Sequence, residues 1–221
     1  MPYKAVIFDM DGLMCDTETY HCEAWGRMLE DFGLKIEEKF FAGLVGVSTN
    51  DNAVTLKNKF NINETPEELL RIRRAHYLEI IGQKRLIPTR GLREVFETIE
   101  LKGLKKAVGT SSPNVEVSPV LTKVLKECGI KVPPEKFFDA IVTSDIVEKV
   151  KPSPEIYLKC LEKLRLRPED CIVLEDSSSG VKSAKAAGMH CIAYKSKYSQ
   201  HQDLSIADKV VDDLTEVPLM I

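Results

Sequence analysis

Residues able to do chemistry recur at the ends of four short apolar runs in this 221-residue chain. Acids follow the first and fourth runs, hydroxyl groups follow the second, and a lysine follows the third after a loop. In chain order they are Asp9, Asp11, Thr110, Ser111, Ser112, Lys151, Glu175 and Asp176. If the runs are parallel strands of one sheet, their carboxyl ends bring these side chains into one crevice, which is where open α/β sheets bind ligands.

That combination of side chains points to one kind of chemistry. Carboxylates gathered in a crevice are costly unless a cation neutralises them. Oxygen ligands favour Mg²⁺, which takes one or two carboxylates together with waters and substrate phosphate. Hydroxyl and ammonium groups beside the ion suit a phosphoryl group, and carboxylates can serve as nucleophile and as general acid and base. The pattern therefore predicts phosphoryl transfer through an aspartyl-phosphate.

The elements that must position these residues alternate as in an α/β protein. The apolar runs cover residues 5–8, 106–110, 140–142, 171–174, 190–194 and 209–211. Segments of helical period lie between them at residues 92–101, 117–128, 154–164 and 180–187. Strands buried on both faces and separated by helices indicate a parallel sheet between helical layers. We therefore predict a doubly wound, Rossmann-like α/β core.

One long segment interrupts the alternation. Residues 17–32, 50–60 and 66–81 have apolar side chains at helical spacing. No stretch between the first two apolar runs has the pattern of a strand. We predict that residues 16–87 form an inserted all-α domain, and that residues 1–15 and 88–221 form the core. The chain length suits a core with a smaller companion.

Composition excludes several classes of protein. The chain has 31 Lys and Arg against 34 Asp and Glu, a formal net charge of -3, which does not favour nucleic acid as a partner. No apolar run reaches the roughly 18 residues of a membrane span, and the N-terminal apolar stretch is too short for a signal peptide. We therefore expect a cytoplasmic protein with reduced cysteines, no membrane partner, and no need for more than a monomer.

The four strand-end motifs resemble those of the haloacid dehalogenase-like hydrolase superfamily. They are Phe8-Asp9-Met10-Asp11-Gly12, the Thr110 strand end, Lys151-Pro152 and Glu175-Asp176. The resemblance spans essentially the whole chain, and an insertion after the first motif is similar to that superfamily's small helical cap. It implies that Asp9 is the nucleophile and a Mg²⁺ ligand. Asp11 is then the general acid and later the base, with its backbone carbonyl on the ion.

The same resemblance implies roles at the other strand ends. Thr110 and Lys151 bind phosphoryl oxygens, with Ser111 beside them, and Lys151 also neutralises the nucleophile. Asp176 is a carboxylate ligand of the metal. Glu175 is a further metal ligand, either directly or through water.

Residues 16–21 and Ala24-Trp25 resemble the subgroup that contains β-phosphoglucomutase and many sugar-phosphate phosphatases. In the mutase, a cap histidine matching His21 touches the acid/base. A packed pair with Trp25 on the cap's inner face is the alternative for His21. Ser112 is the expected neighbour of a substrate hydroxyl, and Arg71, Arg73 and Arg74 are expected on a solvated helix face.

One departure decides between two activities of this subgroup. The mutase carries an arginine just after a Gly-Val-Ser stretch, where it grips the distal phosphate of a bisphosphate. Here Gly46-Val47-Ser48 is followed by Thr49. We therefore predict a Mg²⁺-dependent phosphatase of small phosphorylated metabolites, with a sugar phosphomutase as the alternative. A non-catalytic phospho-switch is a more distant alternative, since receiver domains also place acids, Thr/Ser and Lys at sheet ends but have no such insertion.

Overall fold

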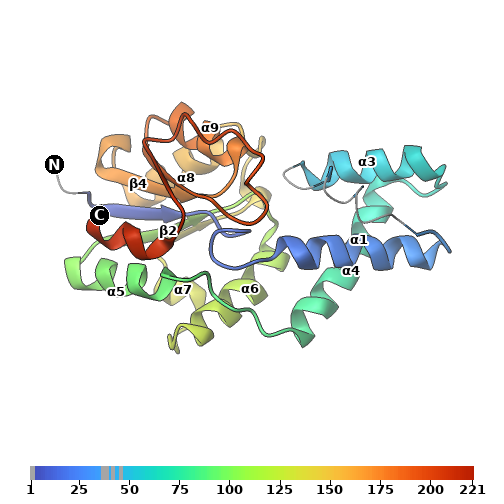
Figure 1. The fold of residues 1–221 in the computed structure, drawn as a ribbon, viewed down its shortest axis with the longest axis horizontal. Helices are drawn as coiled ribbons and strands as arrows, with labels where there is room; N and C mark the ends of the chain where they lie inside the picture. The colour runs from blue at the N-terminus through green and yellow to red at the C-terminus, as the bar shows by residue number, and fades with distance from the viewer. Residues whose placement is uncertain (1–2, 36–39, 41–42, 45–46) are drawn as a thin grey trace. The chain divides into compact units, whose positions relative to one another are not determined.

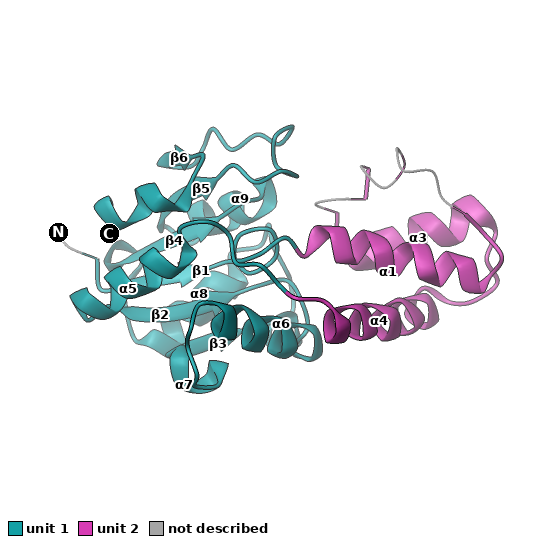
Figure 2. Cartoon of the chain, turned by 60° about the horizontal axis from the view of Figure 1, so that its bottom comes forward, with its two compact units in different colours: residues 1–16, 86–221 teal, residues 17–85 magenta. Residues whose placement is uncertain are grey.

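The computed structural model describes residues 3–35, 40, 43–44 and 47–221. Gly46, part of the stretch before Thr49, lies outside the described residues. The chain forms two compact units, residues 1–16 with 86–221 and residues 17–85, shown in two colours in Figure 2. These boundaries lie one and two residues from those expected from the sequence.

The first unit contains a six-stranded parallel sheet. Its strands are β1 (Ala5–Phe8), β2 (Lys105–Gly109), β3 (Ala140–Val142), β4 (Cys171–Glu175), β5 (His190–Tyr194) and β6 (Lys209–Val211). The strand order β3-β2-β1-β4-β5-β6 confirms the predicted doubly wound topology. The order reverses between β1 and β4, so the ligand crevice of this fold lies at the ends of those two strands.

Helices cover both faces of the sheet, with α8 and α9 on one face and α5 and α6 on the other (Figure 1). The helices are α5 (Leu92–Lys102), α6 (Asn114–Glu127), α7 (Pro134–Phe137), α8 (Glu155–Leu164) and α9 (Ser178–Ala186), with 3₁₀ turns η1 (Ser144–Ile146), η2 (Pro168–Asp170) and η3 (Leu214–Leu219). Successive strand side chains point to opposite faces. In β1, Ile7 packs into the cluster under α8 and α9. Its neighbour Phe8 meets Phe96 of α5, at 5.3 Å between ring centroids.

The second unit is all helical among its described residues. Its helices are α1 (Glu18–Asp31), α3 (Thr49–Phe60) and α4 (Pro66–Gln83). The apolar faces of α1, α3 and α4 share one core that includes Trp25, Leu29 and Leu56. Thr65 and Glu68 form a capping box at the start of α4, which explains why that helix begins at Pro66.

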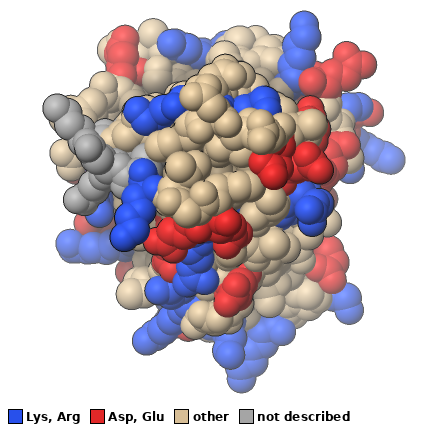
Figure 3. All heavy atoms as spheres, turned by 90° about the vertical axis from the view of Figure 1, so that its right-hand side faces the viewer, with Lys and Arg blue, Asp and Glu red and all other residues tan. Residues whose placement is uncertain are grey.

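Helix length and surface charge are two further features of the described residues. Among the described residues, no helix combines the length and the apolar composition that a bilayer crossing requires. On the described part of the face drawn in Figure 3, Lys and Arg side chains stand among Asp and Glu side chains. Such mixed charge is typical of a solvated surface.

Candidate active site

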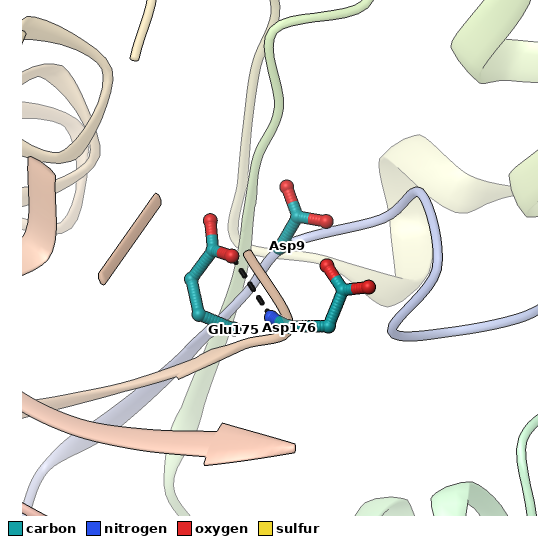
Figure 4. Close-up of side chains that lie close together, drawn as sticks. All are labelled: Asp9, Glu175 and Asp176. Atoms are coloured by element: carbon teal, nitrogen blue, oxygen red, sulfur yellow. Dashed lines mark hydrogen bonds between the residues drawn. The ribbon is translucent and has the colours of Figure 1, made fainter. Parts of the chain in front are cut away.

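Three buried carboxylates meet at the ends of β1 and β4. Asp9 follows β1, Glu175 ends β4 and Asp176 follows it. Each offers an oxygen within 4.8 Å of the others, and all three residues are at most 6% exposed. Figure 4 shows the three carboxyl groups pointing to the same side of their strands. The described residues thus contain a compact, all-oxygen cluster of the kind that holds a divalent cation.

Lys151 supplies a positive charge to this cluster. Its Nζ lies 2.5 Å from Asp9 Oδ1 and 2.6 Å from Glu175 Oε1, and its side chain is only 4% exposed. The loop before it is held in place because the carboxylate of Glu155, at the start of α8, accepts the backbone N–H groups of Glu148 and Lys149. The long-range pairing of Lys151 with Asp9 therefore depends on the α8 entry loop.

The charges at this site do not balance within the protein alone. Burial raises the pKa of the Asp9 carboxyl well above its ordinary value, Lys151 opposes the rise, and Glu175 and Asp11 add to it. Burial lowers the pKa of Lys151, but Asp9 and Glu175 reverse this effect and leave that pKa raised. The Lys151 ammonium thus favours the ionised form of Asp9, and a cation bound beside Asp9 would favour it further. The donor set fits a Mg²⁺ ion.

Two glycines make room for the acids of the cluster. A Cβ at Gly12, whose φ is +78°, would lie 2.2 Å from Asp176 Oδ2. A Cβ at Gly180, in the first turn of α9, would lie 1.6 Å from Glu175 Oε1. Both carboxylates therefore occupy space that only a glycine leaves open.

Asp11 lies apart from the carboxylate cluster and faces the hydroxyl groups that follow β2. Ser112 Oγ donates to Asp11 Oδ2 at 2.7 Å, and Thr110 Oγ1 lies 3.3 Å from the same oxygen. Thr110 Oγ1 in turn accepts the backbone N–H of Ser112 at 3.1 Å. Ser111 is exposed between them. The structure thus brings Thr110 and Ser112 to the predicted acid/base.

His21 belongs to the second unit, where Arg73 and Tyr77 contact it. Its Nδ1 is hydrogen-bonded to an Nη of Arg73, and its ring stacks on Tyr77 with 4.3 Å between centroids. The Arg73 guanidinium carbon lies 5.6 Å from the Trp25 ring centroid. The prediction of a solvated face is wrong for Arg73, which is 1% exposed because its chain packs between aromatic rings, whereas Arg71 is exposed.

Sequence reasoning missed two residues that bind Glu175. The Tyr157 hydroxyl donates to Glu175 Oε1 at 2.8 Å. Ser177 donates both its N–H and its Oγ to Glu175 Oε2, each at 3.0 Å. The run of serines after the fourth strand is a signal that could have located Ser177. Tyr157 lies on the apolar face of a helix, where spacing gives no sign of a polar role.

Comparisons with known proteins identify the family of the chain. The sequence profile of the haloacid dehalogenase-like hydrolases matches residues 6–194. A phosphorylated carbohydrates phosphatase of Thermotoga maritima is 36% identical over 190 residues, which are 86% of this chain and 83% of the relative. A fructose-1-phosphate phosphatase of Escherichia coli is 30% identical over 191 residues, 86% of this chain and 95% of the relative.

A solved structure extends the likeness to three dimensions. The crystal structure of a β-phosphoglucomutase from Clostridium difficile superposes with a TM-score of 0.77 at 25% identity, covering 97% of this chain and 93% of the other. Profile, relatives and fold all point to the same family. The chain therefore belongs to the haloacid dehalogenase-like hydrolase family, and it is a phosphohydrolase of that family's sugar-phosphate subgroup.

Proposed function

We propose that the chain hydrolyses phosphate monoesters of small, sugar-like metabolites through a phosphorylated Asp9. The observation that carries this proposal is the buried pairing of Lys151 with Asp9 inside a cluster of carboxylates. A lysine in that position can hold a phosphoryl oxygen while it keeps the nucleophile ionised. The names of the sugar-phosphate phosphatases among the relatives support the substrate class.

Both steps of the reaction use the same two carboxyl groups, Asp9 as the nucleophile and Asp11 as the general acid and then the base. A carboxylate oxygen of Asp9 forms a bond to phosphorus, the ester bond breaks, and the departing alkoxide takes a proton from Asp11. Asp11 then takes a proton from water, whose oxygen attacks the phosphorus and releases Asp9 and inorganic phosphate. Lys151 and Thr110 would bind the phosphoryl oxygens during both steps, with Ser111 beside them.

Members of this family generally use Mg²⁺. We propose Asp9 and Asp176 as carboxylate ligands of the ion, together with the Asp11 carbonyl that the family resemblance adds. When bound, Mg²⁺ neutralises charge on the phosphoryl oxygens. Glu175 is the remaining acid of the cluster, and both of its oxygens already accept hydrogen bonds.

A residue of the helical unit, Thr49, favours water over a sugar hydroxyl as the group that accepts the phosphoryl group from Asp9. Thr49 is the first residue of α3 and is exposed, with Ser48 as the N-cap whose side chain accepts the N–H of Asp51. A neutral threonine cannot hold a second phosphate as an arginine does. We therefore place phosphatase activity ahead of phosphomutase activity, and we assign the helical unit, with His21, to closing over the substrate and selecting it.

The test is Mg²⁺-dependent release of phosphate from a panel of sugar phosphates, nucleotides and other small monoesters. It is run beside a coupled assay for glucose 6-phosphate formed from β-glucose 1-phosphate with a bisphosphate primer. We expect clear release and little isomerisation. The Asp9→Asn variant should show no turnover, and more than trace activity in it would remove Asp9 as the nucleophile. Isomerisation that outruns release would establish the mutase instead.

A further inference from the structure

Tyr157 is a buried polar residue that the reaction described above leaves without a role. It lies on α8, is fully buried, and belongs to the apolar core under that helix. A phenylalanine would fill the same volume without a hydroxyl to satisfy. A buried phenol is tolerated when its O–H finds a partner, and here that partner is Glu175. The hydroxyl therefore serves the active site rather than the packing of the core.

Tyr157 contacts both members of the ion pair beneath the nucleophile. Its hydroxyl donates to Glu175 Oε1 at 2.8 Å, and the Lys151 Nζ lies 4.8 Å from its ring centroid. Lys151 and Glu175 are themselves 2.6 Å apart. The three side chains thus form a closed triangle, with the ammonium held between a carboxylate oxygen and an aromatic ring.

The other oxygen of Glu175 is fixed separately. Oε2 accepts the N–H of Asp176 at 2.9 Å and two donors of Ser177, all at the start of α9. With the two bonds on Oε1, Glu175 accepts five hydrogen bonds, which leaves none of the roughly four lone-pair sites of a carboxylate open. Glu175 therefore turns its Oε1 edge toward α8, where only Lys151 and Tyr157 share it among the described residues.

We propose that Tyr157 is a positioning residue for Lys151, an inference that rests on the proposed function. Its hydroxyl donates a hydrogen bond to Glu175 Oε1, and this weakens the ion pair between that oxygen and the Lys151 ammonium. Lys151 then remains directed at Asp9 and at the phosphoryl group. Without the hydroxyl, the ammonium shifts toward Glu175 and its hold on both weakens.

The experiment compares Tyr157→Phe with a matched control, Ile156→Val. Both remove one buried heavy atom from neighbouring positions of α8, but only the first touches the site. We expect kcat for the best monoester to fall about tenfold in Tyr157→Phe, the size typical of a hydrogen bond to a charged group, with KM changed less. Ile156→Val should keep kcat within about twofold. An unchanged kcat in Tyr157→Phe, or equal losses in both variants, would overturn the proposal.

A double-mutant cycle separates positioning from general loosening of the core. In a Glu175→Gln background, the Tyr157→Phe change should cost less than about twofold, because the carboxylate through which it acts is gone. The same tenfold loss in both backgrounds would show that Tyr157 does not act through Glu175.

A binding measurement keeps this proposal distinct from the proposed function. Calorimetry with inorganic phosphate and Mg²⁺ reports on Lys151 even if no ester is hydrolysed. We expect the Kd for phosphate to rise about fivefold in Tyr157→Phe and to stay unchanged in Ile156→Val. A wild-type protein that binds phosphate without hydrolysing any ester would remove the proposed function alone. Equal phosphate affinity in all three proteins would remove the role of Tyr157.

Discussion

Replacing Gly12 by alanine tests whether the position of Asp176 sets the affinity for the metal. The new Cβ would lie 2.2 Å from Asp176 Oδ2 and 2.9 Å from its Cγ, so the carboxylate must retreat by about 1 Å to reach ordinary van der Waals contact. We expect Mg²⁺ affinity to fall by roughly 10- to 100-fold, the loss typical when the surroundings of a metal ligand are disturbed. That is about 1.4–2.8 kcal/mol of binding free energy.

The backbone at Gly12 adds a separate cost that a control can subtract. Its φ of +78° is left-handed, which costs a residue with a Cβ about 1–2 kcal/mol of folding stability. Gly129 has a φ of +81°, and a Cβ added there would have nothing within 4 Å, so Gly129→Ala carries the same backbone strain without the collision. Both variants should lose stability, and only Gly12→Ala should also lose Mg²⁺ affinity.

Two measurements decide the matter: calorimetric titration with Mg²⁺, and the Mg²⁺ concentration that gives half-maximal phosphate release. Thermal unfolding of both variants checks that each is folded at the assay temperature. If Gly12→Ala and Gly129→Ala bind Mg²⁺ equally well, Asp176 either is not a ligand or yields without cost, and the reasoning is refuted.

Three further predictions concern the same site. The Cβ of Gly180→Ala would lie 1.6 Å from Glu175 Oε1, so this variant should lower kcat at least tenfold. In the control Gly82→Ala the added Cβ has nothing within 4 Å, and activity should stay intact. Equal activity in the two variants would contradict the close packing of Glu175. Ser112→Ala removes the hydroxyl that donates to Asp11 at 2.7 Å. Hydrolysis of a sugar phosphate should slow several-fold more than hydrolysis of p-nitrophenyl phosphate, because the p-nitrophenolate leaving group needs no acid. An equal loss with both esters would argue against Asp11 as the general acid. Chelation should abolish phosphate release and added Mg²⁺ should restore it, and turnover that persists in excess chelator would contradict the argument from the buried carboxylates.

The motifs at the ends of β1, β2 and β4 were readable because each lies next to a short apolar run. A parallel strand in an α/β core is buried on both faces, so its sequence is apolar throughout and its end is marked by the first polar residue. Asp9 follows β1 and Glu175 ends β4, and the register that pairs Phe8 with Leu174 places these two acids side by side. The topology of a doubly wound sheet then makes the meeting of distant motifs predictable.

The structure decided matters that depend on where side chains turn within the site. Asp11 and Asp9 are two residues apart, yet Asp11 faces the hydroxyls after β2, whereas Asp9 joins the carboxylate cluster. Arg73 lies in a basic run whose charge suggests solvent, but the aromatic side chains of α1 and α4 enclose it. The residues of one helix do not show which side chains of other helices will pack against it in the folded protein.

The sequence alone therefore determined the fold, because local burial leaves a mark in the amino-acid pattern, and the resemblance of its strand-end motifs indicated the family. Only the tertiary structure revealed that Tyr157 contacts both Lys151 and Glu175. That contact joins α8, the loop before it and β4, and its two partners lie 24 residues apart along the chain. Hydrogen bonds of this kind follow from packing in three dimensions, and an apolar helix face gives the same sequence pattern whether or not one of its aromatic residues uses a hydroxyl.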